Sequence, residues 1–233
     1  MKKLLLPALL AFFTTVASAQ SFRFGAKGGF NYTDISGKDA DDKSHREKLG
    51  WHAGLMVNIQ YPGNDWFSVQ PELIYTRKGY ENFSDKTEVK DQSNNLLYTE
   101  QQAGLIGLNY LELPVMFNFR TGILVFEAGP QVSYLVGFKN DAVTNQISAD
   151  GSETNTPSQF RRYSEDRLNK FDYGFATGLR LEAENGAALG VRYSQGFRKI
   201  AKNDKEILLP TEPFIPNAKN QVFQLYVSYL IPE

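Results

Sequence analysis

Cysteine is absent from this 233-residue sequence, and histidine occurs only twice, at His45 and His52. The lack of cysteine excludes disulfides, thiol nucleophiles and thiolate metal sites, and we expect neither a metal nor a cofactor. No apolar run reaches the roughly 18 residues that a membrane-spanning helix needs, which excludes a bundle of such helices. An excess of charge is also missing, because 25 Lys and Arg oppose 26 Asp and Glu. We therefore expect no nucleic-acid partner.

The N-terminus has the order of an export signal. Lys2 and Lys3 precede an apolar stretch at 4–13, and the small residues Ala17-Ser18-Ala19 follow it. This order predicts a signal peptide over residues 1–19, with the mature domain at 20–233. A short N-terminal anchor helix is the alternative interpretation, but the apolar stretch is too short for it.

The rest of the chain has segments in which apolar and polar residues alternate. A period of two indicates strands that present different faces to different surroundings. Each segment exceeds the roughly 9–11 residues that a tilted strand needs to cross a bilayer. The eight segments are 22–34, 50–61, 66–80, 107–119, 122–138, 170–183, 186–198 and 218–230.

Short and long connections alternate along the chain. The short ones, at 62–65, 120–122 and 184–186, contain the Gly, Asn and Asp residues that hairpin turns prefer. The long, polar ones are 35–49, 81–106, 139–169 and 199–217. An even strand count with loops sorted to two ends is typical of outer-membrane barrels. The sequence thus predicts an all-β, eight-stranded antiparallel up-and-down transmembrane β-barrel with short periplasmic turns and long extracellular loops.

Alternation alone does not say which face points outward. A lipocalin-like barrel would place its apolar face inside. Here the apolar set is bulky, while the polar set is rich in Gly, Ala and Ser, and an eight-stranded barrel has a narrow interior. We therefore expect the apolar face to contact lipid, with aromatic girdles near the strand ends formed by Phe22, Tyr32, Trp51, Tyr61, Trp66, Tyr134, Tyr173, Phe197 and Tyr229.

In each predicted strand, the residues that alternate with the apolar ones point into the lumen, and many of them are charged. Buried charges persist only when they are paired and hydrogen-bonded, so we expect Arg/Lys–Glu pairs that fill the barrel. A proton or ion path is the alternative interpretation of the same residues, and an open general porin is excluded because it needs about 16 strands. The candidate lumen residues are Arg23, Lys27, Glu72, Lys78, Glu112, Glu127, Asp172, Arg180, Glu182 and Arg192.

Two prolines fall inside predicted strands. Because proline cannot donate a ladder hydrogen bond, we expect a bulge or a kink at Pro71 and at Pro114.

Several stretches resemble the PorT-like outer-membrane β-barrel family across nearly the whole mature chain. They are Gln70-Pro71-Glu72-Leu73-Ile74-Tyr75 with Lys78-Gly79, Tyr110-Leu111-Glu112-Leu113-Pro114-Val115, Ala128-Gly129-Pro130 with Tyr134-Leu135, and Asp172-Tyr173-Gly174 with Gly178. The resemblance implies eight strands in the outer membrane. It implies little about activity, although one member takes part in protein secretion. The last residues, 230–233, lack the terminal aromatic of outer-membrane insertion signals, so we expect Tyr226 or Tyr229 to serve the insertion machinery.

Residues for catalysis are few. His45 follows Ser44, but neighbours in an extended chain point in different directions and make a poor dyad. His52 is expected on the inward face near the barrel mouth. An aspartate-based protease would need a His-Asp pair at the rim, which the acidic residues Asp39, Asp41 and Asp42 do not complete. We therefore expect no enzyme.

The long loops remain as carriers of function, because loops on a rigid scaffold commonly bind partners. The sequence favours an outer-membrane barrel that acts as a structural or interaction module, contacting lipid and another envelope protein, as an accessory of an envelope or secretion machine. A narrow small-solute channel and a barrel enzyme are the alternatives.

Overall fold

The computed structural model describes residues 21–36, 45–83, 86–141, 143–148, 150–157, 168–202 and 218–232, so the predicted signal peptide lies outside the described residues. No helix among them is long and apolar enough to cross a membrane. Their strands are β1 (Ser21–Ser36), β2 (His45–Gln60), β3 (Phe67–Phe83), β4 (Thr87–Lys90), β5 (Leu96–Thr121), β6 (Leu124–Asn140), β7 (Val143–Ser148), β8 (Glu153–Pro157), β9 (Phe171–Glu182), β10 (Ala187–Lys199) and β11 (Lys219–Leu230).

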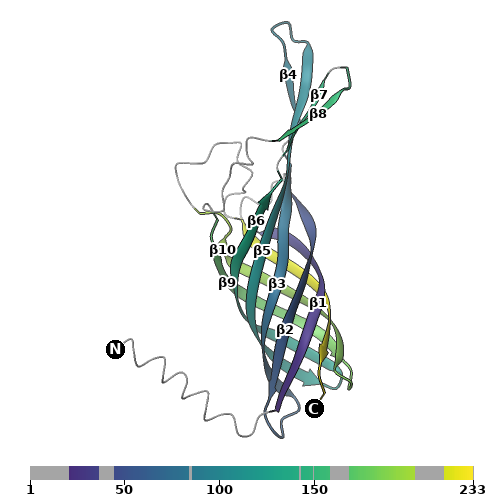
Figure 1. The fold of residues 1–233 in the computed structure, drawn as a ribbon, viewed down its shortest axis with the longest axis vertical. Helices are drawn as coiled ribbons and strands as arrows, with labels where there is room; N and C mark the ends of the chain where they lie inside the picture. The colour runs from purple at the N-terminus through teal and green to yellow at the C-terminus, as the bar shows by residue number, and fades with distance from the viewer. Residues whose placement is uncertain are drawn as a thin grey trace, which may run out of the picture.

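Eight of these strands close into a barrel (Figure 1). Neighbours follow the order β3-β2-β1-β11-β10-β9-β6-β5, and β5 pairs with β3 to complete the circle. Every pairing is antiparallel. Closure gives each of the eight described barrel strands a neighbour on both sides, which a sheet in lipid requires because free peptide groups there cost several kcal/mol each. The predicted eight-stranded barrel is confirmed.

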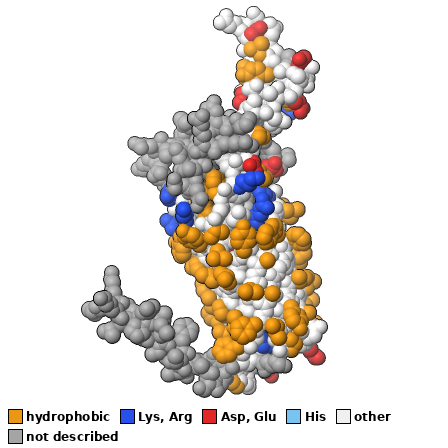
Figure 2. Space-filling model, viewed as in Figure 1, with side chains coloured by type: hydrophobic (Ala, Val, Ile, Leu, Met, Phe, Trp, Pro, Cys, Tyr) orange, Lys and Arg blue, Asp and Glu red, His pale blue; other side chains and the backbone are white. Residues whose placement is uncertain are grey.

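The apolar face of the barrel points outward. Phe30 and Leu55 are 69% and 66% exposed, whereas the adjacent Asn31 and Met56 are buried. Figure 2 shows hydrophobic side chains over the visible face of the barrel, called the apolar belt below, with Lys and Arg at its upper border. All nine expected girdle aromatics are exposed. The outward apolar face is thus confirmed.

Two predicted long loops contain further strands, which corrects the sequence prediction. β5 continues past the barrel to Leu96, where it pairs with β4 on one edge and with β7 on the other; β7 then pairs with β8. The resulting sheet, β4-β5-β7-β8, projects beyond the barrel (Figure 1) and is called the outer sheet below. Its β7 residues are half-buried at every position. Because neither face of this sheet is buried, apolar and polar residues do not alternate along its strands, and the pattern that identified the barrel strands is absent from them.

Of the bulge or kink expected at the two prolines, the bulge is wrong, and the kink stays a prediction. Pro71 pairs with Val115, and Pro114 pairs with Gln131, in registers that continue unchanged on both sides. Each residue of an antiparallel strand sends its N–H toward only one neighbour, so a proline can omit one hydrogen bond without moving the register. The shifts between β5 and β6 and between β2 and β3 occur elsewhere, at 109–110 and 47–52.

Candidate functional site

The barrel lumen holds the candidate site, because it gathers the ten charged residues singled out by the sequence. They come from β1, β3, β5, β6, β9 and β10. Nine are buried, and Arg23 is half-buried. Successive side chains of a strand point to opposite faces, so these residues point into the lumen while their neighbours in sequence point out of the barrel.

Arg192 lies at the centre of the charged residues. Its Nη1 and Nη2 donate to Oε2 and Oε1 of Glu72 at 2.7 and 2.9 Å, and its Nε donates to Oε1 of Glu127 at 2.6 Å. Gln70 also donates to Glu72, at 2.8 Å, and Lys27 approaches the same carboxylate at 3.4 Å. Because all three nitrogens of the buried guanidinium donate to carboxylate oxygens, these charge-assisted hydrogen bonds offset the cost of burying its charge.

An aromatic ring covers part of this centre. The Lys27 ammonium lies 3.7 Å from the centre of the Tyr226 ring, and the Arg192 guanidinium lies 5.6 Å from it, so both cations face its electron-rich surface. Gly190 makes room for this ring, because a methyl group there would overlap the ring and Cβ of Arg180. Small inward residues therefore leave space for large charged and aromatic ones.

The ion pairs continue from Glu127 toward the short-turn end. Arg180 contacts Glu127 through Nη1 and Glu182 through Nε, both at 3.0 Å. Oε1 of Glu182 also forms ion pairs with Nη2 of Arg23, at 3.5 Å, and with Nη2 of Arg120. Arg120 was not among the predicted lumen residues because it falls in a predicted turn, although it lies two residues after the inward-facing Asn118 and so on the same side of the strand.

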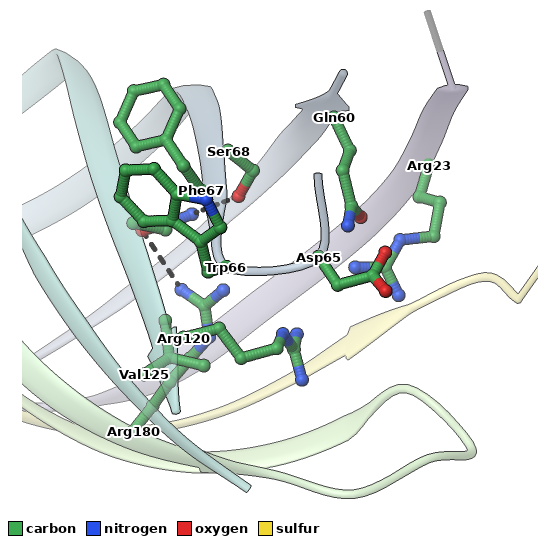
Figure 3. Close-up of a pocket in the computed structure, with 10 residues that line it drawn as sticks. Arg23, Gln60, Asp65, Trp66, Phe67, Ser68, Arg120, Val125 and Arg180 are labelled. Atoms are coloured by element: carbon green, nitrogen blue, oxygen red, sulfur yellow. Dashed lines mark hydrogen bonds between the residues drawn. The ribbon is translucent and has the colours of Figure 1, made fainter. Parts of the chain in front are cut away.

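A small pocket opens beside Glu182. Arg23, Arg120 and Arg180 line it together with Asp65 and Trp66 (Figure 3), and its cavity of about 10 Å³ has room for about one water.

Two acidic groups stand outside this chain of ion pairs. Glu112 pairs with Lys78 at 2.5 Å and accepts a hydrogen bond from Thr76 at 2.9 Å. Asp172 accepts hydrogen bonds from the Asn220 amide at 3.3 Å and from the backbone N–H of Arg198 at 3.1 Å. Its described partners are therefore neutral groups.

The candidates for catalysis are not brought together. His52 is fully buried in the lumen, not at the mouth, and its Nδ1 lies 2.7 Å from Oδ1 of Asn31. Ser44, Asp39, Asp41 and Asp42 lie outside the described residues, as does the side chain of His45. Within the described ranges, His, Asp and Glu form no cluster of three that could hold a metal.

An apolar cluster that the sequence did not predict fills the inward face at the long-loop end. Its buried members are Tyr80, Ile106, Leu108, Tyr110, Leu135, Leu168, Ile200 and Ala218. Residues 168, 200 and 218 flank the long connections, and an apolar residue there carries no signal of which way it points.

Comparison with known proteins identifies the family. A family model described as "Outer membrane protein beta-barrel domain" matches residues 18–202. Curated protein sequences give no significant match. Similar solved structures include neisserial surface protein A (11% identity, TM-score 0.46, covering 91% of this chain and 99% of that one). Ail of Yersinia pestis (13%, TM-score 0.41, covering 91% and 100%) and OprG of Pseudomonas aeruginosa (12%, TM-score 0.36, covering 92% and 98%) are also similar.

The match to the family model spans most of the chain and agrees with the closed eight-stranded barrel and its apolar belt. The chain belongs to the family of outer membrane proteins with a β-barrel domain, and its place is the outer membrane.

Proposed function

We propose that this protein is a closed, non-conducting barrel that anchors the outer sheet outside the cell, where the sheet contacts another envelope or extracellular protein. The observation that carries the proposal is the filling of the lumen at two levels. Ion pairs occupy its middle, and the apolar cluster occupies its long-loop end.

The ion pairs support a closed lumen because they are buried and shared. Opening a path past Arg192 would separate its guanidinium from Glu72 and Glu127, whose side chains are fully buried. Breaking a buried pair costs about 3–5 kcal/mol, so a spontaneously open state would be rare. A narrow solute channel, the competing function, would require these pairs to part.

The outer sheet supports an interaction role because it continues a barrel strand. β5 runs from the barrel into the sheet without interruption, so the barrel holds the sheet's orientation. Paired positions there are polar, such as Gln101 with Asn145 and Asn145 with Asn155. A polar surface on a rigid support is a common place for partner recognition.

Finer assignments belong to the same proposal. Residues 1–19 act as the export signal, the short turns face the periplasm, and Tyr229, which faces outward, serves the insertion machinery. The chain is a PorT-like member of its family and works as an accessory of an envelope or secretion machine, without enzymatic activity.

The orientation and the contact are tested together in intact cells. An epitope inserted at Asn94, in the turn between β4 and β5, is expected to bind antibody on intact cells, whereas one at Gly63 binds only after the outer membrane is opened. A photo-cross-linking residue at Thr144 is expected to form a protein adduct, and one at the lipid-facing Leu55 is the matched control. Antibody binding at Gly63 on intact cells, or adducts to lipid alone from both positions, would overturn the proposal.

A further inference from the structure

The connected ion pairs of the lumen contain more cations than anions. Starting from Lys27, the described contacts run through Glu72, Arg192, Glu127, Arg180 and Glu182 to Arg23 and Arg120. Among the described residues, five cations thus share three carboxylates. Lys78 and Glu112 neutralise each other and do not change this balance. An uncompensated cation in a low-dielectric interior is costly, so a mobile anion close to the excess would be stabilised.

The excess gathers at the short-turn end. Three guanidiniums, those of Arg23, Arg120 and Arg180, converge on the single carboxylate of Glu182. Arg180 is already shared with Glu127. The Arg23 Nε is buried and lacks a hydrogen-bond partner. One donor is therefore unsatisfied beside a carboxylate that already contacts three cations.

The pocket at this end is accessible and is lined by the same arginines. The side chains of Arg23 and Arg120 are 17% and 28% exposed, so solvent ions reach them. Figure 3 shows their guanidiniums at the pocket, with the Asp65 carboxylate near Arg23. Asp65 is exposed, so water screens its charge and it compensates the buried excess only weakly.

We propose that this pocket, called the arginine pocket below, binds one small inorganic anion of chloride size between Arg23 and Arg120. The pocket has room for about one water, which favours a small anion, and the arginines supply only hydrogen-bond donors. The anion compensates one of the two excess positive charges and accepts a hydrogen bond from the unpaired Arg23 Nε–H. This site depends on the lumen geometry alone and stands apart from the proposed interaction role.

The direct test is diffraction from crystals of the refolded protein soaked in bromide, which replaces chloride and scatters anomalously. An anomalous peak is expected within hydrogen-bond distance of Arg23 and Arg120. A well-ordered pocket without a peak would overturn the proposal.

Equilibrium unfolding in detergent micelles gives a second, independent measurement. At constant ionic strength, replacing sodium gluconate with sodium chloride is expected to raise the urea midpoint with a saturable dependence on chloride. Equal midpoints in the two salts across the whole range would count against the site, because screening alone acts equally in both.

Variants separate the pocket from a general salt effect. Arg23→Gln and Arg120→Gln are expected to weaken the apparent chloride affinity at least about tenfold, since each removes a charge-assisted hydrogen bond. Arg77→Gln removes an exposed cation far from the short turns and is expected to leave the chloride dependence unchanged. Glu182→Gln removes the competing carboxylate and is expected to strengthen chloride binding. A weaker affinity in Glu182→Gln, or equal losses in Arg77→Gln, would contradict the arginine pocket.

Discussion

Arg192 and Glu72 form a two-pronged ion pair across the full width of the barrel, with Nη–Oε distances of 2.7 and 2.9 Å. Their strands, β10 and β3, stand four places apart in either direction around the eight-stranded circle. Opposite walls of the barrel are thus joined directly through the lumen, and the proposed closed state depends on this pair.

Removal of Arg192 is expected to destabilise the barrel strongly. Arg192→Met leaves the buried Glu72 and Glu127 carboxylates without their principal cation, at a cost of about 3–5 kcal/mol. Urea unfolding in lipid vesicles measures the change. Arg77→Met, an exposed position on β3, is the control and is expected to alter stability by less than about 1 kcal/mol. Similar losses in the two variants would argue against a special role for the Arg192 pairs.

The apolar cluster at the long-loop end is expected to contribute to stability independently of the ion pairs. Leu108 is completely buried there, so Leu108→Ala should cost about 2–5 kcal/mol through lost contacts and a new cavity. Leu111 lies on the same strand, faces outward and is 38% exposed, so Leu111→Ala should cost less than half as much. Unfolding midpoints of the two variants give the comparison, and a larger loss at Leu111 would contradict the assignment of the faces.

The free-energy cost of placing a charged side chain in the apolar belt is expected to increase with its depth in the bilayer. Leu55 lies midway between the girdle residues Trp51 and Tyr61, so Leu55→Arg should cost about 2–4 kcal/mol in vesicles. Leu49 lies beyond Trp51, and Leu49→Arg should cost about 0–1 kcal/mol. Equal costs at the two positions would show that the belt does not mark the hydrocarbon core.

The tip of the outer sheet contains a turn that depends on an ionised aspartate. Asp91 accepts hydrogen bonds from the backbone N–H groups of Asn95 and Ser93, both at 2.8 Å, and these hold its pKa below the ordinary value. Their support for the turn is therefore complete above the ordinary carboxyl pKa of about 3.9 and is lost as the pH falls through the lower folded value. Proton and carbon NMR in micelles should show the Asp91 carboxyl titrating below that of a model peptide, with the Asn95 amide following the same midpoint. In Asp91→Asn the Asn95 transition should disappear, and its persistence would assign the titration to another group.

The parts of the fold that could be predicted are those in which one face of a strand is hidden and the other is not. Alternation identified the eight barrel strands and put Glu72, Glu127 and Arg192 on the inward side, because lipid and lumen select different side chains. The same rule failed for β7, which is half-buried at every position, and for β8, in which residues 153–156 are all exposed.

The alternation of residues along a strand predicts which side chains point inward, but not which of them contact one another across the lumen. Arg192 and Glu72 are 120 residues apart, and their contact depends on the number and tilt of the strands between them. Arg120 was missed because the strand continues past the expected turn boundary. The inward positions of Leu168, Ile200 and Ala218 depend on how the long connections return to the barrel, which residue type does not encode.

The central claim, that buried ion pairs and the apolar cluster close the lumen, is tested most directly by single-channel recording of the refolded protein in a planar lipid bilayer. Heat-modifiable gel migration of the same sample shows that the barrel is folded. A closed lumen predicts folded protein without steady conductance. Stable, ion-dependent openings of the unaltered protein would contradict it, and Glu72, Glu127 and Arg192 would then be the first residues to neutralise.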